Sequence, residues 1–454
     1  MPNTPVEWLA DRRITNSIST EATQPTITQL SNGNVVIVWA SEDSSSPTST
    51  PGLDLRGQIY DPLGNEIGSE FRVNRTADAH DEVQPSITAI GQTGGFAVVY
   101  NDFETSTTFD IDTDVVIDVF NSSGGWVGGD RITGNAFSSA GTVVEPKIAN
   151  ASGFNVGMAW YNPTTGDVEF QAYRTDTLTE VGTQNVLFNG AVPSGSNGQG
   201  VNGVDIAVAG TGYVVAYANA DPGSDSLVLA AVNTFGNAVS FGATGTSTIT
   251  VASGIESIRD PNITELTNGN FLVTYVVDGS AAQNNSGIRG AIYESDGTFV
   301  TTLGTVATTV AGNQEHPVAV ALPDGQSIIF WQDTDTADLH GQRFAANGSK
   351  IGTEFDVDDS GSLTYPYTDA VLLDDGRVQV AFMEDFQSPT LDSRVFTAIW
   401  DVRDFANAPD PNGYQVGTIT ADTITTQSGT ERVFGHFGDD TIVLRLADAL
   451  NIEE

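Results

Sequence analysis

The chain has no cysteine and few basic residues, and both shortages exclude kinds of function. Without cysteine, its 454 residues form no disulfide, no thiolate metal site and no cysteine nucleophile. The chain has 58 acidic residues and only 17 basic ones. Just two of the basic residues, Lys147 and Lys350, are lysines. The net charge of −41 repels nucleic-acid phosphates and anionic membrane surfaces, so neither is an expected partner.

Long apolar runs and helical periodicity are also missing. No stretch approaches the roughly 18 consecutive apolar residues of a membrane-spanning helix, and the first twenty residues lack the basic and apolar parts of a secretory signal. We therefore expect no membrane-spanning helix. Three possibilities remain for the location of the protein: it stays inside the cell, it is exported by a route that reads no N-terminal signal, or its N-terminus has been trimmed. The 48 glycines and 39% apolar content favour many short strands joined by turns.

One phrase occurs seven times along the chain. Each copy opens a strand, in most copies with proline, passes through a turn that often contains Asn-Gly or Asp-Gly, and ends in an apolar strand closed by an aromatic residue. The copies lie at 24–40, 84–100, 145–161, 204–217, 260–275, 316–331 and 365–382, and their closing aromatics are Trp39, Tyr100, Trp160, Tyr217, Tyr275, Trp331 and Phe382. Each copy predicts a β-hairpin, and the seventh is expected to be two residues longer at its turn.

A second hairpin follows each phrase, most clearly at 55–74 and 339–358, which gives four strands per unit. Such a unit cannot cover its own apolar faces, so the units must stack. Seven units of about 57 residues fit an all-β, seven-bladed β-propeller. The last unit lacks its fourth strand, and a matching segment, 6–17, precedes the first unit. We therefore predict a propeller over 1–405 closed by the N-terminal strand, because closure removes exposed sheet edges, and a linker over 406–416.

The segment 417–454 has a nine-residue rhythm. Its sixth positions hold Asp422, Glu431 and Asp440, and its glycines include Gly429, Gly435 and Gly438. The pattern resembles the repeats-in-toxin family, whose Gly-Gly-x-Gly-x-Asp-x-apolar-x repeats form a calcium-binding parallel β-roll. The match has gaps, because Thr420, Thr426 and His436 stand where a full match has glycine.

The resemblance implies several expectations. The tail is a short parallel β-roll, in which loops eighteen residues apart share an edge and glycine-rich turns bring oxygen ligands around Ca²⁺. We expect at most one well-formed site, between the loops of Asp422 and Asp440, with Gly429, Gly435, Gly438 and Glu431 as the other candidates. Members of the family leave the cell through the type I secretion machinery, so the protein is expected to be secreted, extracellular or at the cell surface.

The propeller offers weaker candidates for chemistry. His316 and Tyr365 each directly precede a strand-opening proline, so both are predicted at one mouth of the central channel. Polar residues also cap strand starts without any catalytic role. The leading hypothesis is a calcium-binding, non-enzymatic protein that recognises an extracellular glycan, cell-surface or protein ligand. The alternatives are an extracellular polysaccharide lyase or glycoside hydrolase on a propeller scaffold, and a purely structural surface protein.

Overall fold

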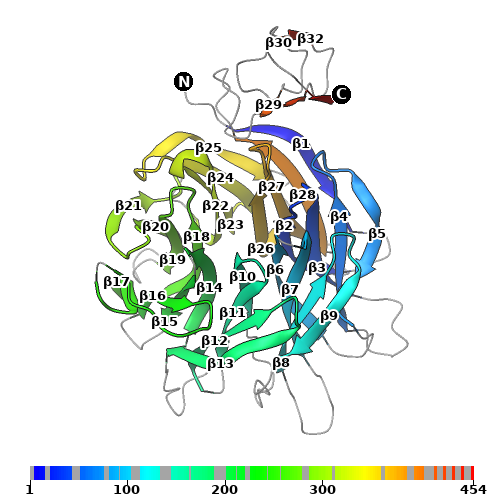
Figure 1. The fold of residues 1–454 in the computed structure, drawn as a ribbon. Helices are drawn as coiled ribbons and strands as arrows, with labels where there is room; N and C mark the ends of the chain where they lie inside the picture. The colour runs from blue at the N-terminus through cyan, green and yellow to red at the C-terminus, as the bar shows by residue number, and fades with distance from the viewer. Residues whose placement is uncertain are drawn as a thin grey trace.

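The computed structural model is a ring of seven four-stranded antiparallel sheets, so the predicted seven-bladed β-propeller is confirmed (Figure 1). The structure describes residues 5–15, 21–42, 52–75, 81–91, 93–103, 113–132, 145–162, 165–188, 201–210, 212–219, 225–242, 244–255, 257–278, 286–308, 312–358, 363–385, 393–402, 414–416, 423–425, 432–434, 441–443 and 451–453.

Blades 1 to 6 each take four strands that follow one another in the chain. Blade 1 is β2 (Ala22–Gln29), β3 (Val35–Glu42), β4 (Leu53–Tyr60) and β5 (Glu66–Arg72), and blade 2 is β6 (Asp81–Ile90), β7 (Gly95–Phe103), β8 (Thr113–Phe120) and β9 (Trp126–Arg131). Blade 3 is β10 (Lys147–Ser152), β11 (Asn155–Asn162), β12 (Asp167–Arg174) and β13 (Thr179–Phe188), and blade 4 is β14 (Val201–Ala209), β15 (Gly212–Asn219), β16 (Asp225–Asn233) and β17 (Thr248–Ile255). Blade 5 is β18 (Ile258–Glu265), β19 (Phe271–Asp278), β20 (Ser286–Tyr293) and β21 (Phe299–Thr305), and blade 6 is β22 (Gln314–Ala321), β23 (Ser327–Asp333), β24 (Asp338–Phe344) and β25 (Lys350–Asp358).

Blade 7 draws on both ends of the propeller segment. It is β26 (Leu363–Leu372), β27 (Val378–Asp385), β28 (Ser393–Asp401) and, from the N-terminus, β1 (Val6–Arg13). Within the described part of the chain the helical element is η1 (Pro323–Gly325), a single 3₁₀ turn. None of the described helical structure has the length and apolar character needed to cross a membrane.

The first strand of each blade lies against the first strands of its two neighbours and so surrounds the central channel. The second strand of each blade is almost wholly buried, as in β3, because apolar side chains on both of its faces pack against adjacent blades. Seven apolar clusters fill the seven interfaces between blades, including the one between blade 7 and blade 1. The ring is therefore held together by stacking, as expected for repeats that cannot bury their faces alone.

Strand β1 closes the ring, as the sequence predicts. It pairs antiparallel with β28, with Val6 opposite Asp401 and Arg13 opposite Phe396. Trp8 is buried in the apolar cluster between blades 7 and 1. The guanidinium of Arg377 lies 3.6 Å from the centre of the Trp8 ring, and it donates hydrogen bonds to Asp375 and to the carbonyl of Pro62 in blade 1.

The seventh hairpin differs from its prediction, because its turn is not longer than the others. In blade 7 the N–H of Leu373 donates to the carbonyl of Arg377, just as Leu30 donates to Asn34 in blade 1. The extra residues lie instead at the start of β26, between Thr364 and Thr368. Tyr367, not Tyr365, therefore corresponds to Gln24 and His316. Tyr365 resembles them in sequence only because Pro366 follows it.

The described strands of the tail pair in parallel, outside the ring (Figure 1). They are β29 (Tyr414–Val416), β30 (Thr423–Thr425), β31 (Arg432–Phe434), β32 (Thr441–Val443) and β33 (Asn451–Glu453). Tyr414 lies opposite Arg432 and Thr423 opposite Thr441, each pair eighteen residues apart. This agrees with the predicted parallel β-roll-like tail, although β29 already begins within 406–416.

Candidate functional site at the channel mouth

In six of the seven blades, a β-bulge at the start of the first strand turns one side chain toward the channel. In blade 1, Thr23 pairs with Ala40 and Thr26 with Val38, so Gln24 and Pro25 together face the single residue Trp39. Blades 2, 5 and 6 repeat this two-against-one arrangement opposite their own closing aromatics. A bulge changes the direction of the side chain that it carries. In these four blades, the two bulge residues lie opposite the aromatic residue that closes the second strand.

The residue before the bulge proline has an unusual backbone conformation. Five of these residues have positive φ, between 45° and 56°: Gln24, Gln84, Glu145, Asp260 and His316. Residues with a side chain rarely adopt this region, a following proline disfavours helical backbone, and the strain costs roughly 1–3 kcal/mol per residue. The seven equivalent positions form a ring, which we call the rim, and five of its members are strained. The rim consists of Gln24, Gln84, Glu145, Gly203, Asp260, His316 and Tyr367.

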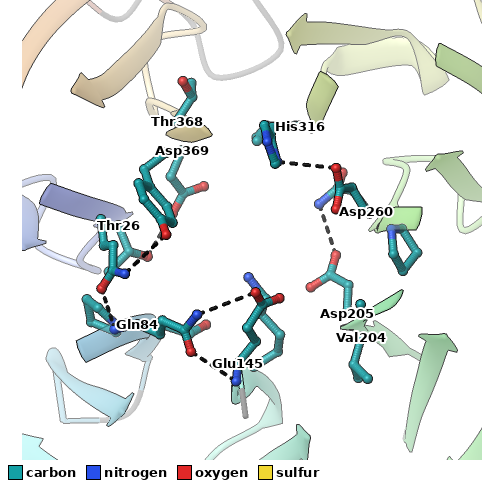
Figure 2. A pocket seen from close by; sticks show the side chains of 18 of the residues that line it. Thr26, Gln84, Glu145, Val204, Asp205, Asp260, His316, Thr368 and Asp369 are labelled. Carbon is teal, nitrogen blue, oxygen red and sulfur yellow. Dashed lines mark hydrogen bonds and ion pairs between the residues drawn. The ribbon is translucent and has the colours of Figure 1, made fainter. Parts of the chain in front are cut away.

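The rim surrounds a cavity of about 280 Å³. Its wall is built from three consecutive positions of every blade, namely the rim residue and the two that follow it. Figure 2 shows Gln84, Glu145, Asp260 and His316 around the opening, with Asp205 and Asp369 among the side chains of the wall. Because all seven blades contribute equivalent positions, the cavity is the mouth of the central channel.

Hydrogen bonds join one side of the rim into a belt. Gln24 Nε2 donates to the Tyr367 hydroxyl at 3.3 Å, and the N–H of Gln84 donates to Gln24 Oε1 at 2.6 Å. The N–H of Glu145 in turn donates to Gln84 Oε1 at 3.1 Å. The belt therefore runs through blades 7, 1, 2 and 3, and it fixes the orientation of its amide side chains.

An ion-pair network occupies the other side of the rim. His316 Nδ1 lies 3.3 Å from Asp260 Oδ2, and its Nε2 lies 3.8 Å from Glu315 Oε2. Arg259 contacts both of these carboxylates, at 2.8 Å and 2.6 Å, and Asp278 at 3.2 Å. Blades 5 and 6 thus place an imidazole between two carboxylates at the mouth.

Two aspartates next to the rim accept hydrogen bonds from the neighbouring blade in the same way. Asp369 Oδ2 accepts from the Thr26 hydroxyl and from the N–H of Ile27, at 2.8 Å and 3.0 Å. Asp205 Oδ2 accepts from Asn262 Nδ2 and from the N–H of Ile263, at 2.9 Å and 2.8 Å. Each carboxylate thereby satisfies a strand N–H that faces the channel, which is a structural role.

The same two carboxyl groups have perturbed acidities. Burial raises the pKa of Asp205 from 3.8 to about 6, against the opposing effect of Lys147, and the nearby charge of Asp369 also raises it. Burial likewise raises the pKa of Asp369, again opposed by its hydrogen bonds and by Lys147. A carboxyl group whose pKa is raised toward neutral pH is able to act as a general acid.

The substitution Asp205→Asn tests the acidity of this group. The folded protein holds the Asp205 proton more tightly than the unfolded chain, so ionisation of Asp205 lowers stability as pH rises from about 4 to about 6. Asparagine does not titrate, so the loss of stability between pH 4 and pH 6 should be smaller in Asp205→Asn by about 2–3 kcal/mol. Its side-chain oxygen can still accept the hydrogen bond from the N–H of Ile263. Urea unfolding of both proteins across this pH range measures the effect, and parallel pH profiles would contradict it.

The candidates from the sequence fare differently. His316 lines the mouth as predicted. Tyr365 belongs to β26, and its side chain lies outside what the structure describes, whereas Tyr367 lines the cavity. The tail candidates Gly429, Glu431, Gly435 and Gly438, with Asp422 and Asp440, lie outside the described residues. Within the described ranges no group of three histidine or acidic side chains is arranged to hold a metal ion.

Sequence reasoning missed Lys147, Asp205 and Asp369. All three occupy the second position after the rim residue, and all three face the cavity. The repeated phrase holds the available signal: when the seven copies are aligned on their turns, this column is polar in every copy except the sixth, which has Val318. Lys147 is one of only two lysines in the chain, and this rarity is a second signal in the sequence.

The fold and this mouth define a seven-bladed propeller with a polar central cavity. No protein-family model matches the chain, and no curated protein matches it. The chain is similar in fold to a protein of unknown function from Dyadobacter fermentans DSM 18053, with a TM-score of 0.52, 10% identity, and coverage of 87% of this chain and 99% of that one.

Two further solved structures are similar over nearly their whole length. One is α-L-arabinanase from Penicillium chrysogenum complexed with arabinobiose, with a TM-score of 0.50, 14% identity, and coverage of 88% of this chain and 99% of that one. The other is the polysaccharide lyase Uly1, with a TM-score of 0.52, 8% identity, and coverage of 87% and 99%. At these identities the likeness concerns the fold.

Proposed function

We propose that the protein is a carbohydrate-active enzyme that cleaves a glycosidic bond at the channel mouth. The observation that carries the proposal is the pair of carboxyl groups, Asp205 and Asp369, which face one polar cavity and whose pKa values are raised. The similar arabinanase and polysaccharide lyase, which act on carbohydrates, support this choice over a purely binding role.

The proposal assigns one role to each carboxyl group. Glycoside hydrolysis commonly uses one protonated carboxyl group and one carboxylate. Asp205, with a pKa of about 6, would donate its proton to the departing glycosidic oxygen as the bond to the sugar carbon breaks. Asp369 would take a proton from the water molecule that attacks that carbon. The belt amides of Gln24 and Gln84 would bind sugar hydroxyls, because they are already oriented.

The proposal is tested by a screen of neutral, amine-bearing and acidic polysaccharides for new reducing ends and new double bonds. Wild-type protein should release reducing ends from at least one of them, and Asp205→Asn should lower the rate by about 100-fold or more. Glu66→Gln, at an exposed position on the outer strand β5, is the control and should retain full activity. Absence of cleavage by wild type, or full activity of Asp205→Asn, would refute the catalytic role.

A second candidate, a glycan-binding protein without catalysis, is favoured by one observation. Asp205 and Asp369 make the same hydrogen bonds to the next blade, so structure alone accounts for their presence. The two candidates differ in a single result: a binder retains a sugar at the mouth without ever producing reducing ends.

For the tail, we propose the calcium-binding role that its resemblance to the repeats-in-toxin family implies, with export by type I secretion. The eighteen-residue offset of its described parallel strands, with Thr423 opposite Thr441, supports this role, because in the repeats-in-toxin roll loops eighteen residues apart share an edge. Calcium is then a ligand of the tail and not of the channel.

Calcium should stabilise the tail alone. Ligand at one hundred times its Kd adds about 2.7 kcal/mol to the folded state, so a tail transition should shift upward with calcium and return with chelator. Asp440→Ala should abolish the shift, whereas Glu431→Ala, predicted on the other edge, should reduce it less. Calorimetry of the whole chain measures both, and a calcium shift that persists in Asp440→Ala would count against the site.

A further inference from the structure

The rim has one gap, at blade 4. Six of its seven positions carry polar side chains, but the blade 4 position is Gly203, followed by Val204 in place of proline. Gly203 has a φ of +117°, and a Cβ atom there would lie 2.7 Å from Pro261 Cδ. Blade 4 therefore tolerates no side chain at this point, because Pro261 of blade 5 fills the space. The rim thus has no polar side chain on the strand that carries Asp205, which lines the cavity two residues further along.

Carboxylates surround this gap. Glu145 stands on the rim at blade 3, Asp260 at blade 5, and Asp205 lies on blade 4 between them (Figure 2). The hydrogen bond that Gln84 Nε2 donates to Glu145 Oε1 is long, at 3.4 Å, and Glu145 is exposed. With Asp369, the cavity wall contains four carboxylates, against Lys147 and His316 as its basic residues.

The basic groups near the gap are already shared among several acids. Lys147 acts on both Asp205 and Asp369, whose pKa values it lowers. Arg259 divides its guanidinium between Asp260, Asp278 and Glu315, and His316 lies between Asp260 and Glu315. The gap therefore faces an excess of negative charge, which favours a cationic ligand group and repels an anionic one.

We propose that the mouth selects a glycan with protonated amino groups, an amino sugar that is not N-acetylated, over glycans of uronic acids. The ammonium group enters at Gly203 and lies against the carboxylate of Glu145, while the belt amides bind the hydroxyls of the neighbouring sugar. This inference rests on the proposed function and adds its substrate class. A uronate in the same position would place its carboxylate among the four of the wall, so the site also disfavours the substrates of uronate lyases.

The test is titration calorimetry of the full chain with three matched tetrasaccharides: β-1,4-glucosamine, its N-acetylated form and galacturonate, at mildly acidic pH and physiological salt. The amine oligomer should bind one per chain, about tenfold or more tighter than the N-acetylated one, and the uronate should bind weakest. Glu145→Gln should lower the affinity for the amine oligomer about tenfold and leave the N-acetylated oligomer unchanged.

Glu66→Gln is the matched control, because it removes the same charge from an exposed outer strand. If it weakens amine binding as much as Glu145→Gln does, the preference comes from the overall charge of −41 and the inference is wrong. Equal or tighter binding of the uronate also overturns it. If sugars bind or are cleaved at the mouth without amine preference, the inference fails and the proposed function stands. If none of the three binds or is cleaved, both fail.

Discussion

Deletion of residues 1–15 should leave a chain that no longer folds as a monomer. The deletion removes the fourth strand of blade 7, uncovers the edge of β28, and takes Trp8 out of the cluster between blades 7 and 1. Truncation of a buried Trp to Ala alone costs about 3–5 kcal/mol. With the lost ladder hydrogen bonds, the total approaches the roughly 5–15 kcal/mol that keeps a typical protein folded.

The deleted protein should elute as oligomers in size-exclusion chromatography, because an open strand edge pairs with other chains. A synthetic peptide of residues 5–15 added in trans should restore the monomer by pairing with β28. Removal of residues 403–454, at the other end of the chain, is the control and should leave unfolding of the ring unchanged. A deleted protein that stays monomeric and unfolds at the wild-type denaturant concentration would show that β1 does not hold the ring together.

Arg377→Ala should destabilise the protein by about 3–5 kcal/mol. Arg377 is 1% exposed, and its partner Asp375 is 5% exposed. Without the guanidinium, the carboxylate stays buried with less compensation, the Trp8 ring loses the cation stacked on it, and the carbonyl of Pro62 loses a donor. Because these contacts span blade 7, β1 and blade 1, the loss falls on the closure of the ring.

The chain contains a matched control for Arg377. Arg174 and Asp176 also pair two residues apart, at 2.9 Å, but on the surface, where such pairs contribute little. Arg174→Ala should therefore unfold in urea with no measurable change, whereas Arg377→Ala should unfold at a clearly lower concentration. Similar midpoints for the two variants would contradict the role assigned to Arg377.

The repeated phrase predicted the number of blades because its pattern recurs in every copy, and the matching strand at 6–17 predicted the closure of the ring. Alternation, Gly-containing turns and closing aromatics are local features, so one sequence suffices to read them. In the seventh copy the sequence alone suggests the wrong register, because Pro366 resembles the bulge proline of other blades. The hydrogen bond from the N–H of Leu373 to the carbonyl of Arg377 sets the true register.

The site was harder to predict because it is assembled from single residues of seven distant strands. Asp205 follows Gly203 and Val204 in a copy without an opening proline, so the repeated phrase is recognisable only after its rim position. Its raised pKa arises from burial and from Asp369, 164 positions away in sequence, and no local pattern records such a neighbour. His316 was found because it precedes a proline, which is a local signal.

An engineered disulfide between β1 and β28 tests the closure of the ring most directly. Closure brings blade 7 beside blade 1, where Gln24 donates a hydrogen bond to Tyr367 and Thr26 donates one to Asp369. Ile14 donates to the carbonyl of Val395, so the next pair, Arg13 and Phe396, is a non-hydrogen-bonded pair with Cα atoms about 4.5 Å apart, within disulfide range. With no native cysteine, the variant Arg13→Cys, Phe396→Cys should oxidise to a monomer with no free thiol. Free thiols after oxidation, or disulfide-linked dimers, would contradict a ring closed by its own N-terminal strand.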